Sequence, residues 1–177
     1  MQTSVIIVAA GSGTRLGYGM PKAAVPLGQG SILSHCLQRV PANFAEQIIV
    51  VVPQDHQGLA SQVERFAEQR PDLEVNHVGG GSSRAESVSN GMAALKGGTA
   101  AVLIHDAARP LTPEPVWDRV KAALANGADA VIPGLPLVDT IKEVRDATVV
   151  TTVDRSKLFA AQTPQGFNVD QLRKAQA

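Results

Sequence analysis

The sequence predicts an α/β protein with a Rossmann-like, mostly parallel central sheet, helices on both faces of that sheet and a protruding β-hairpin arm. Short runs that are apolar on both sides are typical of buried parallel strands. Such runs lie at 5–10, 48–52, 100–104 and 130–133, with a weaker one at 73–78. Segments with helical spacing of apolar residues alternate with these runs, as they do in βαβ units. Polar extended runs near the end of the sequence predict the arm.

The segments between the strands share apolar residues at three- and four-residue spacing, which predicts a helix in each. They lie at about 31–40, 59–70, 85–96 and 113–126, and from 169 or 170 onward. Ser31 and Thr112 each precede such a segment and are N-cap residues by type, with Pro113 expected at the first helical position. Cys36 lies on the apolar face of the first segment, so we expect it to pack in the core.

The pattern changes after Pro136. Two extended runs, 139–144 and 149–153, are rich in threonine and charged residues and flank a short polar turn. We expect them to form a hairpin arm, at about 137–160, on a single domain that spans 1–177. An isolated hairpin is marginally stable in water, so this arm should pair with something else.

Composition excludes several classes of function. Hydrophobic residues make up 44% and charged residues 18% of the chain, as in ordinary globular proteins. The net charge is zero, so nothing favours binding to nucleic acid or to an anionic membrane. The chain opens with no targeting segment, and no apolar run approaches the ~20 residues of a membrane span. We therefore expect a cytoplasmic protein.

The loop 11–22, which directly follows the first strand, is the strongest functional signal. Its glycines do not match the dinucleotide fingerprint, because the sixth position is Leu16, and no Lys-Ser/Thr pair follows its last glycine as a P-loop requires. What remains is a long glycine-rich loop with two cations, Arg15 and Lys22. Such a loop suits a nucleoside triphosphate, and its cations suit the charge that develops at a reacting phosphorus.

Other cations also lie at predicted loops or on the arm, which fits a small anionic ligand, although each one alone is compatible with a solvated surface charge. The full set is Arg15, Lys22, Arg84, Arg109, Lys142 and Arg155. Asp106 ends a buried strand, where it could contact Mg²⁺ held largely by a triphosphate, or simply cap a turn. The loop at Gly80-Gly81, with Ser87 one turn into the next helix, could approach a flat base or be a structural turn. We interpret His105 as a structural histidine.

Six motifs, in this order along the chain, resemble those of sugar-nucleotide-type nucleotidyltransferases and, among them, the 2-C-methyl-D-erythritol 4-phosphate cytidylyltransferases. They are 9–17 with Pro21-Lys22, 80–88, 105–110, 139–142, Asp154-Arg155 and 163–167. The first motif alone marks only the superfamily, whereas His105 to Pro110 together with Asp139 to Lys142 are far more specific. The resemblance covers essentially the whole chain.

The resemblance implies an enzyme that joins CTP to 2-C-methyl-D-erythritol 4-phosphate, with Mg²⁺, in non-mevalonate isoprenoid biosynthesis. The products would be 4-diphosphocytidyl-2-C-methyl-D-erythritol and pyrophosphate, formed by in-line attack of the substrate phosphate on the α-phosphorus of CTP. By similarity, the catalytic residues would be Arg15, Lys22 and Arg155. CTP would be held by Ala10, Gly11, Gly13, Arg15, Lys22, Gly80, Gly81 and Ser87. The polyol phosphate would be held by Asp106, Arg109, Thr140 and Arg155, with Asp106 also the candidate metal contact.

The same resemblance implies a homodimer in which the arm reaches the neighbouring subunit. It also implies a Thr-Asp element and an Ile-Lys-Thr element that this sequence, ending at Ala177, does not contain, so we expect the C-terminal part of the family's fold to be absent. Two alternatives stay open. One is a cytidylyltransferase for another polyol phosphate such as ribitol 5-phosphate, and the other is a truncated, inactive nucleotide-binding or dimerisation module.

Overall fold

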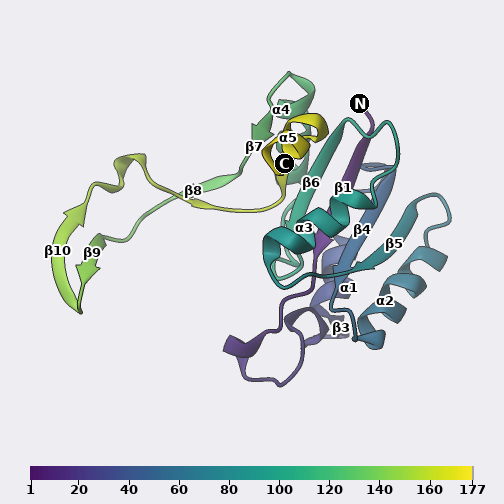
Figure 1. The fold of residues 1–177 in the computed structure, drawn as a ribbon, viewed down its shortest axis with the longest axis horizontal. Coiled ribbons are helices and arrows are strands. Elements are labelled where there is room, and N and C mark those ends of the chain that lie inside the picture. The colour runs from purple at the N-terminus through teal and green to yellow at the C-terminus, as the bar shows by residue number, and fades with distance from the viewer. Residues whose placement is uncertain (177) are drawn as a thin grey trace.

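The computed structural model describes residues 1–176, and for Arg15 it describes the backbone alone. Within that range the centre is a sheet of six strands in the order β5-β4-β1-β6-β12-β7 (Figure 1). The strands are β1 (Thr3–Val8), β4 (Gln47–Val52), β5 (Glu74–Gly79), β6 (Ala101–Asp106), β7 (Ala130–Val131) and β12 (Gln165–Asn168). β1 pairs in parallel with both β4 and β6, and β4 pairs in parallel with β5. The predicted α/β class with a mostly parallel sheet is confirmed.

Helices cover both faces of this sheet, as predicted. They are α1 (Ile32–Gln38), α2 (Gln57–Glu68), α3 (Arg84–Ala93), α4 (Glu114–Ala125) and α5 (Val169–Gln176). One face packs on α1, α2 and α4 and buries strand residues such as Val5, Ile7 and Leu103. The other face packs on α3 and α5 and buries Ile6 and Val102. None of the helices in the described part of the chain has the length and apolar character that crossing a membrane requires.

The predicted cap of α1 is confirmed. A small hairpin of β2 (Pro26–Leu27) and β3 (Gly30–Ser31) leads into the helix. The Ser31 hydroxyl accepts a hydrogen bond from the Ser34 backbone N–H at 3.1 Å, and the Ser34 hydroxyl accepts one from the Ser31 N–H at 2.8 Å. This reciprocal capping box satisfies two backbone donors that the helix itself leaves without partners. Cys36 is fully buried in the core, also as predicted.

The predicted cap of α4 is wrong. The helix begins at Glu114, its N-cap is Pro113, and the Thr112 hydroxyl instead donates to the Arg109 carbonyl at 3.2 Å. A cap at Thr112 would have placed Pro115 at the third helical position, where a cap needs a backbone N–H and proline has none. The threonine therefore closes the preceding turn.

Strand β12 was not predicted as a strand. It runs antiparallel between β6 and β7, with Phe167 opposite Val102 on one side and Ala130 on the other. The strand expected at 130–133 consequently shrinks to β7, which has two residues and pairs with β12 rather than with β6. Gly166 lies so close to α4 that an added Cβ would meet the Val120 side chain at 2.5 Å. Glycine is therefore the residue that lets α4 approach this strand.

The arm projects far from the sheet, as Figure 1 shows. It consists of two antiparallel ladders, β8 (Gly134–Pro136) with β11 (Phe159–Ala161) and β9 (Ile141–Arg145) with β10 (Thr148–Val153). Asp146 and Ala147 form the tip and both have positive φ, at 48° and 58°, as a two-residue hairpin turn of this twist requires. The predicted arm is confirmed, and its paired base extends slightly beyond 137–160.

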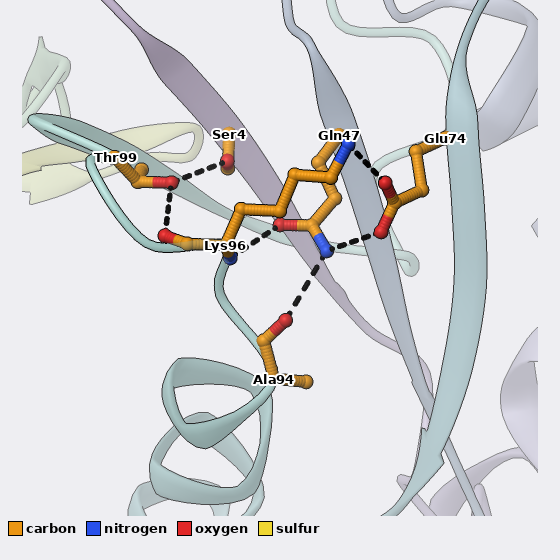
Figure 2. A network of polar contacts seen from close by, with 6 residues as sticks. All are labelled: Ser4, Gln47, Glu74, Ala94, Lys96 and Thr99. Atoms are coloured by element: carbon orange, nitrogen blue, oxygen red, sulfur yellow. Dashed lines mark hydrogen bonds and ion pairs between the residues drawn. The ribbon is translucent and has the colours of Figure 1, made fainter.

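A partly buried polar network joins β4, β5 and the turn after α3 at the amino ends of the strands (Figure 2). Gln47 lies at its centre and is 1% exposed. Its amide nitrogen donates to Glu74 and to the Ala94 carbonyl, each at 3.1 Å, and its amide oxygen accepts from the Lys96 N–H at 3.1 Å. The Lys96 ammonium also pairs with Glu74. One side chain thus satisfies backbone groups that the helix end leaves open.

We expect Gln47→Leu to destabilise the fold by about 2 kcal/mol, because the partly buried hydrogen bonds to the Ala94 carbonyl and from the Lys96 N–H would be lost. Urea unfolding followed by circular dichroism measures this change. Gln38→Leu, at the exposed end of α1, is the matched control and should change stability by less than about 0.5 kcal/mol. Equal effects of the two substitutions would contradict a structural role for the network.

Candidate active site

The loops that the sequence predicted to converge lie at one edge of the sheet. The last residue of β1, Val8, is paired with Val51 of β4 and with Asp106 of β6. Beyond the strands the pairing continues, because Ala107 N–H donates to the Val8 carbonyl at 3.1 Å and Gly80 N–H donates to the Val52 carbonyl at 2.7 Å. The loops after β1, β5 and β6 therefore begin side by side at the carboxyl ends of the strands, where α/β sheets bind ligands.

The loop after β1 folds back on itself around Gly13. The Lys22 N–H donates to the Gly11 carbonyl at 3.2 Å and closes the loop. Gly13 has φ 70°, and an added Cβ would meet the Lys22 nitrogen at 2.8 Å, so both backbone angle and space require glycine. A pocket of about 360 Å³ results, lined by Gly11, Ser12, Gly13, Thr14, Leu16 and Lys22. The prediction for the side chain of Arg15 lies outside the described part of the chain.

A second pocket, of about 330 Å³, lies between the loops after β1 and β5. Its lining is Ala10, Pro53, Gln54, Gly80, Gly81, Ser82 and Glu86. Ser87 is 2% exposed and lies behind this lining, where its hydroxyl accepts a hydrogen bond from the Gly81 N–H at 3.1 Å. Glu86 accepts hydrogen bonds from the hydroxyl and the N–H of Ser82, which lower the pKa of its carboxyl. The loop is thus held in shape from inside the first turn of α3.

Gly80 sets the width of this second pocket. A Cβ at Gly80 would overlap the Cβ of Ala10 and meet the Ser87 hydroxyl at 3.2 Å. We expect Gly80→Ala to push the two loops apart and to weaken nucleotide binding about 10-fold or more, since displacements near 1 Å are costly at such sites. Isothermal titration with CTP measures the change. Gly97→Ala, where a Cβ would meet nothing, is the control, and equal losses of affinity would refute a role for Gly80 in the pocket.

Asp106 lies at the same edge and is held by its neighbours. Arg84, the first residue of α3, places its Nε 3.1 Å and its Nη2 3.0 Å from Asp106 Oδ1. The Asp106 backbone N–H donates to the Thr163 hydroxyl at 3.2 Å. The carboxylate thereby joins the loop after β5 to the loop after β6.

His105 is buried and fully hydrogen-bonded. Its Nε2 lies 3.1 Å from the Arg109 carbonyl, which can only accept, and its Nδ1 lies 2.9 Å from the Thr163 hydroxyl. Nε2 must therefore carry the proton, while Nδ1 accepts from the threonine. Burial lowers the pKa of this imidazole to about 4. The interpretation of His105 as a structural histidine agrees with this geometry.

Arg109 points to a different place from Asp106. Its guanidinium contacts the Gln162 side chain, and it lines a pocket of about 540 Å³ at the base of the arm together with Arg119. Apolar residues make up much of the wall, among them Leu111 and Leu135. The structure thus places this predicted substrate contact beside the arm and outside the two pockets at the loops after β1 and β5.

Thr140 and Arg155 lie on the arm. Both are exposed, and Arg155 donates to the Val138 carbonyl across the arm. Figure 1 shows the arm extending away from the loops at the sheet edge. Within one chain the structure therefore brings Asp106 beside the loops after β1 and β5, whereas Arg109, Thr140 and Arg155 lie apart from these loops.

Two contacts of this region were not foreseen from the sequence. The Thr163 hydroxyl accepts a hydrogen bond from the Asp106 backbone N–H and also contacts His105. Arg84 forms an ion pair with Asp106. Both residues belong to recognised motifs, but no spacing rule connects positions so far apart in the chain. Among the described residues no group of three or more His, Cys, Asp or Glu side chains could hold a metal ion.

Known proteins resemble this chain in sequence. A family model described as IspD, 2-C-methyl-D-erythritol 4-phosphate cytidylyltransferase, matches residues 3–177. The enzyme of that name from Streptomyces avermitilis is 44% identical, over 98% of this chain and 73% of its own length. The one from Corynebacterium diphtheriae is 42% identical, over 96% and 70%.

The fold comparison gives the same result. The crystal structure of 4-diphosphocytidyl-2C-methyl-D-erythritol synthase from Anaerococcus prevotii superimposes with a TM-score of 0.83 at 28% identity. It covers 99% of this chain, which in turn spans 74% of that protein. On these matches of sequence and fold, the chain belongs to the 2-C-methyl-D-erythritol 4-phosphate cytidylyltransferase family.

Proposed function

We propose that this protein transfers the cytidylyl group of CTP to 2-C-methyl-D-erythritol 4-phosphate. The observation that carries the proposal is the pair of adjoining loops at the sheet edge. One loop, closed by Gly13 and ending at Lys22, has the size and charge for a triphosphate. The other, at Gly80 and Gly81, offers a narrow slot between backbone segments. Family membership supplies the nucleotide and the acceptor.

In this proposal the cytosine ring enters the slot formed by Ala10, Gly80 and Gly81, with Ser87 holding the slot in shape. The triphosphate lies over the backbone of Gly11 and Gly13, whose N–H groups suit phosphate oxygens. The side chains of Arg15 and Lys22 complete the nucleotide-binding half of the site. The polyol phosphate takes the remaining side of the edge, beside Asp106.

The reaction is a single displacement at the α-phosphorus. An oxygen of the substrate phosphate attacks in line and forms the new P–O bond, while the bond from the α-phosphorus to the bridging oxygen breaks. That oxygen leaves with its electron pair as part of pyrophosphate, and no covalent bond to the protein forms. Lys22 and Arg15 act by neutralising the charge that builds on the transferring group, where fixed cations have their largest effect.

The residues present suit Mg²⁺ only as an ion that arrives with the nucleotide. Mg²⁺ keeps water and phosphate ligands and takes one or two carboxylates at most, and the described residues offer no cluster beyond that. Asp106 is our candidate for such a carboxylate ligand, as an alternative to its contact with the polyol phosphate. When bound, Mg²⁺ would neutralise charge on the triphosphate and on the departing pyrophosphate.

We further propose a homodimer in which the arm completes the site of the neighbouring subunit. We assign Arg109, Thr140 and Arg155 to the polyol phosphate. Thr140 and Arg155, however, lie on the arm, which extends away from the ligand-binding loops of the same chain. Large apolar side chains are exposed along the arm, including Val138 at 80% and Phe159 at 60%. An exposed apolar ladder of this kind favours a protein partner.

Mixing two impaired variants tests the exchange of arms, with the polyol phosphate kept well below its KM so that Arg155→Ala retains only about a tenth of the wild-type rate. A Lys22→Ala chain and an Arg155→Ala chain, unfolded together and refolded, would form mixed dimers with one intact site each. We expect about one quarter of the wild-type activity to return, because random pairing makes half of the dimers mixed. An arm that contacts the site of its own chain would restore no activity beyond that of the two variants.

Arg155→Ala alone should raise the KM for the polyol phosphate about 10-fold and leave the KM for CTP unchanged.

Release of pyrophosphate tests the reaction itself. We expect release from CTP with 2-C-methyl-D-erythritol 4-phosphate and little with ribitol 5-phosphate. Release of pyrophosphate only with ribitol 5-phosphate would show that ribitol 5-phosphate, and not 2-C-methyl-D-erythritol 4-phosphate, is the acceptor. No release with either compound, despite binding of CTP, would leave a nucleotide-binding module and contradict the proposed activity.

A further inference from the structure

The contact between Arg84 and Asp106 has no part in the function described above. Arg84 is the first residue of α3 and directly follows the loop that lines the slot at Gly80 and Gly81. Asp106 ends β6 on the side assigned to the polyol phosphate. Their ion pair is therefore a direct link between the nucleotide side and the acceptor side of the edge.

The geometry of the pair is one-sided. Nε and Nη2 of Arg84 both reach Oδ1 of Asp106, at 3.1 and 3.0 Å. Oδ2 receives no hydrogen bond from any side chain that the structure describes. The backbone of Asp106 is fixed as well, since its N–H donates to Thr163 and its carbonyl accepts from the Arg109 N–H at 2.9 Å. The carboxylate is thus held by one oxygen, and its second oxygen remains available to a ligand.

Stability is not a sufficient reason for this pair. The two side chains are 50% and 31% exposed, and pairs as exposed as this contribute about 0–1 kcal/mol. Arg70 and Asp72 form a similar ion pair in the turn before β5, at the end of this strand that lies away from the loop at Gly80 and Gly81. What distinguishes the pair of Arg84 is its position between two ligand-bearing loops.

We propose that Arg84 is a positioning residue for the acceptor. Held by Arg84 through Oδ1, Asp106 presents Oδ2 to accept a hydrogen bond from a hydroxyl group of the polyol phosphate. Because Arg84 directly follows the loop at Gly80 and Gly81, its ion pair couples the position of the Asp106 carboxylate to the nucleotide side of the site. The inference rests on the proposed transfer to a polyol phosphate and adds the residue that prepares the acceptor side.

Steady-state kinetics of Arg84→Ala test this role. We expect the KM for the polyol phosphate to rise about 10-fold, the size of one lost charged hydrogen bond, with the KM for CTP changed less than about 2-fold. Arg84→Lys should recover part of the loss, because it keeps the charge with fewer fixed donors. Arg70→Ala is the matched control and should leave both KM values unchanged. A rise in the KM for CTP alone would overturn the inference.

A double-mutant cycle separates positioning from a general structural effect. In an Asp106→Ala background, Arg84→Ala should cost little more, since its target is gone. Independent, multiplying losses would overturn the inference. So would a shift in the Mg²⁺ concentration dependence of Arg84→Ala with unchanged KM for the polyol phosphate, because that result would make Asp106 a metal ligand.

The outcome is distinguishable from failure of the proposed function. If the wild-type protein uses ribitol 5-phosphate instead, the proposed substrate is wrong, and the same cycle run with that compound still decides the role of Arg84. If neither compound turns over, calorimetric binding to the CTP-loaded protein decides it, and weaker binding by Arg84→Ala supports the inference. A wild-type protein that binds no polyol phosphate overturns it.

Discussion

Replacing Lys22 with alanine is expected to lower kcat about 100-fold, a loss typical of a removed transition-state contact. The loop after β1 fixes the Lys22 backbone by a 3.2 Å hydrogen bond to Gly11 and lines one pocket with both residues. In the proposed reaction, a cation held there would contact the triphosphate in the ground state, but the charge it would neutralise is greatest while pyrophosphate departs. The KM for CTP should therefore change far less than kcat, by about 3-fold or less.

Single-turnover and steady-state assays of pyrophosphate release measure both constants. Lys174→Ala, on the exposed side of α5, is the control for loss of a positive charge and should behave as wild type. An unchanged kcat would remove Lys22 from the transition state. A loss confined to the KM for CTP would make Lys22 a nucleotide-binding residue only. Arg15→Ala is expected to follow the same pattern.

Acid should destabilise this fold in a defined pH range. Burial lowers the pKa of His105 from 6.5 to about 4, so between these values the unfolded chain binds a proton that the folded protein does not. The free energy of unfolding should fall as the pH drops from about 6.5 to about 4, by roughly 3 kcal/mol in total, and the contribution of His105 should be constant outside that range. Protonation would also require Nδ1 to donate toward Thr163, whose hydroxyl now donates to it.

Denaturant unfolding at half-unit pH steps measures the slope. His105→Gln is expected to be less stable at neutral pH but to lose most of the slope between pH 6.5 and 4. His77→Gln, at an exposed position on β5, should keep the wild-type slope. Glu86 and Asp154 have carboxyl pKa values lowered by hydrogen bonds from Ser82 and Ser156, so their contributions are lost only at lower pH. A slope unchanged in His105→Gln would refute the assignment.

The parts of the fold that depend on local pattern could be predicted from the sequence. β1, β4 and β6 are apolar on both sides because both faces of the sheet are covered, and the cap at Ser31 needs only its own helix. β12 could not be predicted in this way. It has four residues, and its pairing with β6 depends on chain more than fifty positions earlier. No periodicity within so short a segment specifies such a partner.

The candidate site divides in the same manner. The loops around Gly13 and Gly80 carry their own signal, because close backbone approach demands glycine. The links between loops do not, since the contacts of Arg84 with Asp106 and of Thr163 with His105 form only after the sheet has assembled. The roles of Thr140 and Arg155 depend on how two chains are arranged in a dimer, and these roles remain predictions.

The antiparallel strand β12 has a consequence for how the chain folds on the ribosome. β1, β4, β5 and β6 can pair as soon as residue 106 emerges, yet one edge of β6 stays open until β12 arrives. Thr163 follows His105 by 58 positions, which at about 5–20 residues per second corresponds to roughly 3–12 s of synthesis. During that time a buried, apolar strand presents unpaired backbone to other nascent chains. Protection of this edge, by rapid translation of the arm or by a chaperone, would therefore determine how much protein reaches the native state.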